Sequence, residues 1–222
     1  MMLRSHDPAV YDKWVTNEMK FNDPRVIEAM NFFGSFAKDD AMVNGGAAAV
    51  ATTDFRDSPA GLFTSPAQCM MHRQASFIPA FFPKDLEAGT DYDFFYFPAF
   101  AEKDLGRPVL GGGTLFSITK DSEATRAFMD FLKHPSSHEA WMAKGGFLTP
   151  HKGVDLDKYS SDTFKGLGEI LLGATTFRFD GSDLMPGAIG AGSFWTGMVD
   201  FTSGQSAEEV ANAIQASWDA IK

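Results

Sequence analysis

The chain has 222 residues, of which 44% are hydrophobic and 22% are charged, a balance typical of a globular protein with a packed core. Its net charge of −10 disfavours binding to nucleic acid, because phosphates repel an acidic surface, and gives no reason to expect contact with anionic lipid. A single cysteine, Cys69, excludes an intrachain disulfide and a cysteine-based zinc site.

The first third of the chain predicts a helix, a connector and a short strand. Asp23 and Pro24 are typical of an N-cap and a first helical position, and apolar residues then recur at helical spacing as far as Ala37. Residues 44–61 are rich in Gly, Ala and turn formers, which predicts a loop or mobile connector. Residues 69–71 predict a buried strand that leads into a loop and a short helix.

The middle third predicts two more strands and two helices. The aromatic run at residues 93–98 and the segment 115–119, which follows three glycines, are both typical of strands. Residues 121–123 open a well-marked helix that Pro135 stops. Ser136 and Glu139 have the spacing of a capping box for a second helix.

The last third is helix-rich, so that the whole chain is predicted to be of mixed α/β class. Asp162 is placed to cap a helix, and the Gly-rich residues 181–193 predict a long loop, a feature that is usually functional in a compact domain. Helical spacing resumes over residues 195–202. Ser206 and Glu209 then form a clear capping box for the terminal helix.

The sequence gives little support for a catalytic nucleophile, a nucleotide-binding loop or a metal site. The chain has no G-x-S-x-G elbow, and its Gly-rich stretch 111–113 lacks the lysine of a phosphate-binding loop and precedes a predicted strand. His134 and His138 have a spacing that could hold zinc on one helix, but Pro135 interrupts it. We therefore expect neither a metal site nor a cofactor.

Paired carboxylates leave a hydrolase open as the alternative. Asp180 with Asp183, or Glu102 with Asp104, could serve as the two carboxyl groups of a glycosidase. One of them would have to be kept protonated by an apolar pocket. Carboxylates are weak evidence alone, since sugar-binding proteins also use them to accept hydrogen bonds from hydroxyl groups.

Two segments combine polar groups with aromatic faces, as a sugar requires. In the first, His72, Arg73 and Gln74 follow the predicted strand and Phe77 offers a flat ring; we favour this binding interpretation over a strand end whose Arg73 pairs with an acid. In the second, Trp195 stands where the Gly-rich loop turns into a helix. From the residues alone, a core tryptophan is the favoured interpretation there.

Several motifs together resemble family 1 solute-binding proteins of ABC transporters, and α-glucoside-binding proteins among them. The resemblance covers nearly the whole chain, and its motifs are specific as a set and weak one at a time. Residues 111–120, 144–150, 185–186 and 193–195 carry the match to the family. Residues 55–59, 72–77 and 177–183 carry the match to the α-glucoside-binding branch.

The resemblance implies a periplasmic-binding-protein-like fold (type II), in which two α/β lobes close on a sugar by hinge motion. Residues 1–110 would be part of lobe two, 111–159 a return segment of lobe one, and 160–222 the C-terminal helices and ligand loop of lobe two. Family members are much longer, so the chain is expected to be N-terminally truncated and its lobe-one segment to expose apolar area. Its own start lacks a signal peptide, which would indicate the cytoplasm only if Met1 were the true start; the parent protein is expected to be periplasmic.

The resemblance also implies a binding role without catalysis. Trp195 falls on the family's C-terminal stacking tryptophan, which reverses the preference for a core residue, and Phe77 stands where most members have a tryptophan. The ligand would be an α-glucoside or related oligosaccharide, and the partner a membrane permease. The expected contact residues are His72, Arg73, Gln74, Phe77, Gly112, Gly113, Asp180, Asp183, Phe194 and Trp195.

Overall fold

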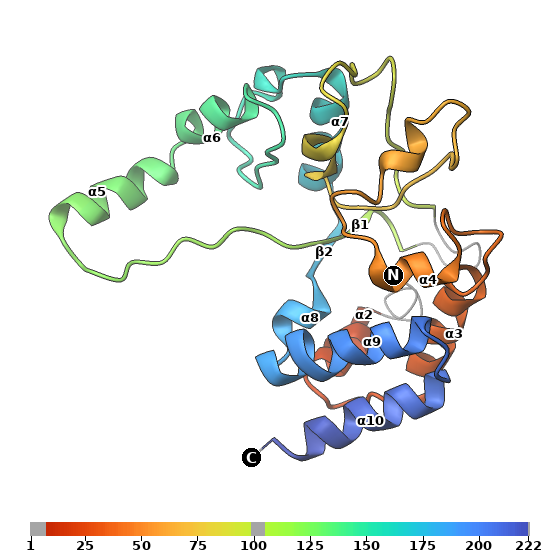
Figure 1. Ribbon diagram of the computed structural model, residues 1–222. Helices are drawn as coiled ribbons and strands as arrows, with labels where there is room; N and C mark the ends of the chain where they lie inside the picture. The colour runs from red at the N-terminus through yellow and green to blue at the C-terminus, as the bar shows by residue number, and fades with distance from the viewer. Residues whose placement is uncertain (1–7, 99–104, 222) are drawn as a thin grey trace. The chain divides into compact units, whose positions relative to one another are not determined.

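A computed structural model describes residues 8–98 and 105–221 of the chain. Within these ranges the chain is mainly helical (Figure 1). The α-helices are α2 (Pro8–Val15), α3 (Pro24–Ala37), α4 (Ala47–Thr52), α5 (Glu123–Leu132), α6 (Pro135–Met142), α7 (Asp162–Leu172), α8 (Gly181–Leu184), α9 (Phe194–Thr202) and α10 (Ala207–Asp219). Short 3-10 helices are η1 (Ala60–Leu62), η2 (Ile78–Phe81) and η3 (Leu156–Lys158), η4 (Ala188–Ser193) is a π-helix, and strands β1 (Pro108–Gly111) and β2 (Thr176–Phe179) form a two-stranded sheet.

Contacts divide the chain into two compact units. Among the described residues, unit 1 comprises 8–72, 105 and 179–221, and unit 2 comprises 73–98 and 106–178. The prediction of a mixed α/β chain that is rich in helices toward its C-terminus is confirmed in this coarse form.

Unit 1 has an aromatic and aliphatic core between its helices. In Figure 1, α9 and α10 run alongside each other, and both contact the π-helix η4. Phe21, Phe201 and Ile214 are fully buried there, and each such side chain contributes about 1.5–3 kcal/mol through the area it removes from water. The backbone N–H of Phe21 donates to Oε1 of Gln215 at 2.6 Å, so the buried side-chain amide of Gln215 has a hydrogen-bond partner.

Unit 2 has a smaller core around α7. Met142, Tyr159 and Phe164 form its buried centre, and partly buried side chains of residues 147–167 pack around them. The Tyr159 hydroxyl oxygen accepts a hydrogen bond from the backbone N–H of the fully buried Thr149 at 3.2 Å. The stretch 144–150, which carries part of the family resemblance, is therefore fixed onto this core.

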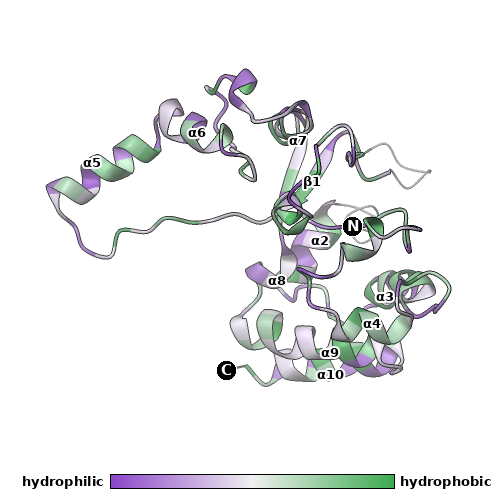
Figure 2. Ribbon diagram, turned by 45° about the horizontal axis from the view of Figure 1, so that its top comes forward, coloured by the Kyte–Doolittle hydropathy of each residue, from purple (hydrophilic) through white to green (hydrophobic). Residues whose placement is uncertain are grey.

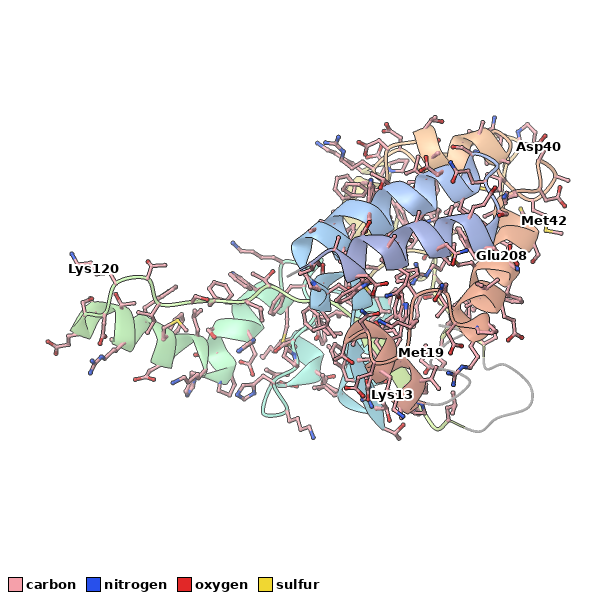
Figure 3. All side chains as sticks on the ribbon, turned by 90° about the horizontal axis from the view of Figure 1, so that it is seen from below. Lys13, Met19, Asp40, Met42, Lys120 and Glu208 are labelled. Atoms are coloured by element: carbon pink, nitrogen blue, oxygen red, sulfur yellow. The ribbon has the colours of Figure 1, made fainter. Side chains whose placement is uncertain are left out.

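Helix α5 in unit 2 is strongly two-faced but buries none of its residues in the described structure. Phe128 and Phe131 are 54% and 52% exposed, and Figure 2 shows the apolar and polar stripes along the helix. The expected exposure of apolar area in this segment is confirmed. In Figure 3 the side chain of Lys120 stands off the extended loop that leads into α5.

Several predicted elements are wrong in detail. Residues 69–71, 93–97 and 115–119 form no strand, because no neighbouring strand of the described chain offers them a ladder of hydrogen bonds. The N-cap of α6 is His134, not Ser136, because Pro135 takes the first helical position. The N-cap of α7 is Ser161, one residue before Asp162.

The segment 181–193 is also not the predicted long loop. It forms α8 and then η4. Gly190 lies so close to the Ser182 carbonyl oxygen that a Cβ atom there would stand 1.9 Å from it. The glycine that suggested a loop is therefore required by a close approach of two backbone segments.

Candidate functional site

Trp195 lies in the first turn of α9 and is 69% exposed. The preceding Phe194 packs inward, with its ring centroid 5.6 Å from that of Trp14 and 5.1 Å from that of Phe21. The favoured interpretation from residues alone, a core tryptophan at position 195, is therefore wrong, because Phe194 occupies the core at this point. Trp195 is a large flat ring held on α9 and mostly exposed to solvent.

Asp180 and Asp183 flank the start of α8. Asp180 is its N-cap: its Oδ1 accepts the Ser182 backbone N–H at 2.9 Å and also the Ser182 hydroxyl. Asp183 is exposed in the first turn. One carboxylate is occupied by a cap and the other is open to water, so neither lies in the apolar pocket that a glycosidase acid requires. The other pair of carboxylates, Glu102 and Asp104, lies outside the described residues.

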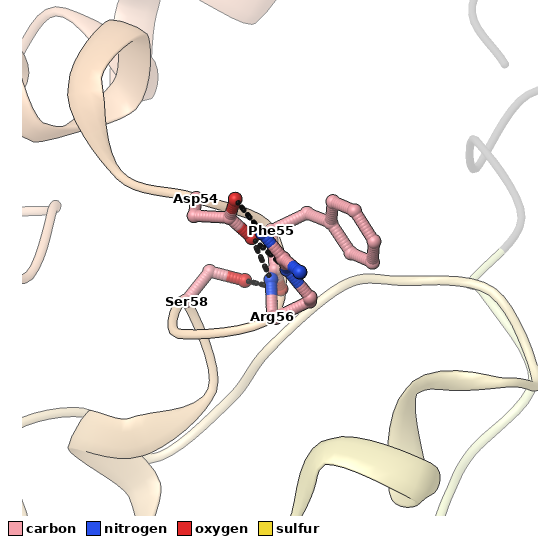
Figure 4. Close-up of polar contacts among 4 residues, drawn as sticks. All are labelled: Asp54, Phe55, Arg56 and Ser58. Atoms are coloured by element: carbon pink, nitrogen blue, oxygen red, sulfur yellow. Dashed lines mark hydrogen bonds and ion pairs between the residues drawn. The ribbon is translucent and has the colours of Figure 1, made fainter.

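The loop of residues 54–58 is an ordered polar turn (Figure 4). The Arg56 guanidinium donates two hydrogen bonds of 2.8 Å to the Asp54 carboxylate, and these hold the pKa of Asp54 well below its usual range. Phe55 is nearly half exposed, and the Arg56 guanidinium carbon lies 5.8 Å from the centroid of its ring. The predicted loop is therefore confirmed at residues 54–58, whereas residues 47–52 of the same predicted connector form helix α4.

His72 lies in unit 1 and is half-buried beside this loop. Its Nε2 is 2.9 Å from the Ser58 hydroxyl oxygen. Burial lowers the pKa of His72, so the neutral imidazole is favoured near pH 7. A neutral ring has one nitrogen that donates and one that accepts, which suits recognition of a hydroxyl group.

The remaining predicted polar residues belong to unit 2. Arg73 is exposed and forms no ion pair within the described ranges, so the interpretation in which it pairs with an acid finds no support there. Gln74 Oε1 accepts the Ala75 backbone N–H at 2.9 Å. Phe77 caps η2, is 43% exposed, and lies edge-on to Phe81 with centroids 6.4 Å apart.

Gly112 and Gly113 follow β1 in unit 2, and both are exposed. A Cβ atom on Gly113 would meet nothing within 4 Å, so steric crowding in this unit does not require a glycine there. Gly111, in contrast, lies against the Phe177 ring, 3.1 Å from where a Cβ atom would stand. The role of Gly112 and Gly113 toward a ligand stays a prediction.

The predicted contact residues divide evenly between the units. Unit 1 holds His72, Asp180, Asp183, Phe194 and Trp195, and unit 2 holds Arg73, Gln74, Phe77, Gly112 and Gly113. The surface hollow that the side chains of unit 2 enclose between residues 87–90 and 156–165 contains none of them. Ser58, which lies within hydrogen-bond distance of His72, was not among the residues expected from the sequence, because 14 positions separate the two.

The histidines considered for zinc are engaged in structural hydrogen bonds. Nε2 of His138 lies 2.9 Å from the Leu132 carbonyl oxygen, and its Nδ1 lies 2.9 Å from the Thr149 hydroxyl. His134 caps α6 through Nδ1. Among the residues described, no three metal-binding side chains cluster, and no helix is both long and apolar enough to cross a membrane.

Comparison with known proteins finds that the chain is similar to binding proteins. It is similar over essentially its whole length to two curated proteins, both named for the solutes they bind. No protein-family model matches it, and no solved structure matches it. The predicted resemblance to solute-binding proteins is thereby confirmed.

The two relatives differ in the solute that their names give. The chain is 60% identical over 223 aligned residues to the alpha-glucosides-binding periplasmic protein AglE of Rhizobium meliloti (strain 1021). It is 40% identical over 218 residues to the osmoprotective compounds-binding protein GgtB of Synechocystis sp. (strain ATCC 27184 / PCC 6803 / Kazusa). The chain spans about half the length of these relatives, 49% of the first and 51% of the second.

Proposed function

We propose that the chain is a portion of the substrate-binding component of an ABC sugar importer, that it acts in the periplasm, and that it binds an α-glucoside or related oligosaccharide without chemistry. The observation that carries this proposal is the 60% identity, over the whole chain, to a protein named for binding α-glucosides. The exposed, rigidly held Trp195 supports it, because such a ring packs against the C–H face of a sugar.

The polar groups of the proposed site are suited to sugar hydroxyls. In unit 1, His72 and Asp183 supply acceptors and donors at partly or fully exposed positions. In unit 2, considered by itself, the exposed Arg73 supplies donors. A site built to hydrogen-bond hydroxyl groups discriminates against ligands that lack them, because its polar groups would be left unpaired. Trp195 offers an apolar face in unit 1, and Phe77 offers one in unit 2.

The fold that we propose is the two-lobe type II arrangement, with residues 1–110 and 160–222 in lobe two and 111–159 in lobe one. The exposed apolar face of α5, which lies inside the segment 111–159, supports this assignment, since such a face belongs against other structure. Hinge closure and docking on a membrane permease would then be properties of the full-length protein.

Calorimetric titration with maltose and trehalose tests the proposal, with glycine betaine as a non-sugar osmoprotectant. We expect saturable heat from at least one α-glucoside and none from glycine betaine. Saturation by glycine betaine alone would refute the sugar assignment and favour a ligand of the kind for which the second relative is named.

A hydrolase would be revealed by its product. After prolonged incubation with maltose, we expect no glucose above the level of a buffer blank. Glucose release that disappears in an Asp180→Asn or Asp183→Asn variant would establish catalysis and overturn the binding-only proposal.

A further inference from the structure

The loop of residues 54–58 and the ring of His72 share a hydrogen-bond chain with a fixed direction. The Ser58 hydroxyl lies 2.8 Å from the Phe55 carbonyl oxygen and 2.9 Å from His72 Nε2. All three groups belong to unit 1. The order of donors and acceptors along this chain determines which nitrogen of His72 carries a proton.

The carbonyl oxygen at one end sets that order. A carbonyl can only accept, so the single hydrogen of the Ser58 hydroxyl points to Phe55. The Ser58 oxygen is then left with its lone pairs toward His72 and must accept from Nε2–H. The reverse arrangement would bring two acceptor oxygens to 2.8 Å with no hydrogen between them.

A neutral imidazole carries one proton, and here Nε2 holds it. Nδ1 is therefore a bare acceptor, and no described residue donates a hydrogen bond to it. Burial lowers the pKa of His72, which keeps the ring neutral and the acceptor available near pH 7. Arg56 cannot act as the acceptor, because a guanidinium carries only donors, and it donates to the Asp54 carboxylate.

We infer that Ser58 is a positioning residue that holds His72 as its Nε2–H tautomer, so that Nδ1 accepts a hydrogen bond from a hydroxyl group of the ligand. This inference rests on the proposed function for the identity of the ligand, but its tautomer part stands on the geometry alone. It assigns Ser58 a role in recognition through His72, to which the Ser58 hydroxyl is hydrogen-bonded while it also donates to Phe55.

Nitrogen-15 NMR of the labelled chain tests the tautomer. The His72 ring signals are assigned by their loss in His72→Asn, and we expect a protonated Nε2 and a bare Nδ1 in the wild type. Ser58→Ala should shift His72 toward a mixture of tautomers, whereas Ser58→Thr, which keeps the hydroxyl, should restore the wild-type signals. A protonated Nδ1 in the wild type, or a Ser58→Ala spectrum identical to it, would overturn the inference.

Addition of maltose tests the second part separately. We expect the Nδ1 signal to move more than the Nε2 signal on saturation, and Ser58→Ala to weaken maltose binding several-fold while Ser58→Thr does not. Maltose binding that leaves the Nδ1 signal unshifted would refute the proposed role of Nδ1 as the acceptor. If calorimetry shows no sugar binding by the wild type, the proposed function fails in this chain, whereas the tautomer spectrum still decides the role of Ser58.

Discussion

At the scale of single residues, Trp195 and Phe194 are adjacent but have opposite environments. Phe194 fills the aromatic core with Trp14 and Phe21, while Trp195 faces solvent. Reasoning from sequence identified the pair but did not assign the core role to Phe194. The reason is physical: at the start of a helix, adjacent positions point about 100° apart, and only the packed partners decide which one is buried.

Replacement of Trp195 by alanine should weaken sugar binding without unfolding the chain. By analogy with aromatic pairs, a stacked ring contributes about 0.5–1.5 kcal/mol beyond the area it covers, which corresponds to roughly a two- to tenfold loss of affinity. Calorimetry with maltose measures the loss, and Trp141→Ala, which removes an exposed tryptophan of unit 2, is the matched control. Equal affinities for both variants would argue against a ligand contact at Trp195.

The half-buried ring of His72 should make the free energy of unfolding depend on pH. Because burial lowers the pKa of His72 from its ordinary 6.5, the unfolded chain binds more protons than the folded chain just below that pH. The free energy of unfolding should therefore fall as the pH drops below about 6.5, until the folded-state pKa is passed. Urea unfolding at several pH values measures the free energy of unfolding. His72→Asn should reduce the dependence of this free energy on pH below about 6.5. Parallel profiles for the two proteins would show that His72 does not contribute.

At the scale of elements, the helix starts were largely predictable and the strands were not. The predicted caps Asp23 and Ser206 are local signals, and both are confirmed, the second with its complete capping box. The helix predicted to open at residues 121–123 begins at Glu123. A strand depends on a neighbour that can be distant in sequence, so the aromatic run 93–97 remained without a ladder despite its strand-like composition.

The close contact between α8 and η4 makes Gly190 irreplaceable. Gly190→Ala would place a Cβ atom 1.9 Å from the Ser182 carbonyl oxygen, and relief of such a clash typically costs about 1–3 kcal/mol or more. Urea unfolding should show this loss. Gly187→Ala is the matched control, since a Cβ atom there meets nothing within 4 Å, and its stability should be unchanged or slightly higher. Indistinguishable midpoints for the two variants would contradict the packing described.

The apolar face of α5 should bind hydrophobic dyes. Phe128 and Phe131 are each more than half exposed, and unpartnered aromatic side chains attract such probes. The double variant Phe128→Ser and Phe131→Ser should lower the fluorescence of a bound naphthalene sulfonate dye severalfold. Asp130→Ser on the same helix should not lower it. A dye signal that survives the double variant would place the exposed apolar surface elsewhere.

At the scale of the whole molecule, the chemistry proposed for ligand binding could be read from the sequence, whereas the spatial arrangement of the residues could not. Runs such as residues 72–77 combine donors, acceptors and a ring, and this chemistry is readable without a structure. That Ser58 lies against His72 was not readable, because 14 positions and a turn separate them. The predicted ligand-contact residues are divided between two units by packing contacts, and this division was likewise not readable from the sequence.

The most direct test of the central claim is saturation-transfer NMR of maltose with this chain and with Trp195→Ala, a method that detects weak as well as strong binding. We predict transfer from the wild type to the C–H protons of a glucose ring, loss of most of that signal in Trp195→Ala, and unchanged maltose throughout. No transfer from the wild type, or equal transfer from both proteins, would contradict the account.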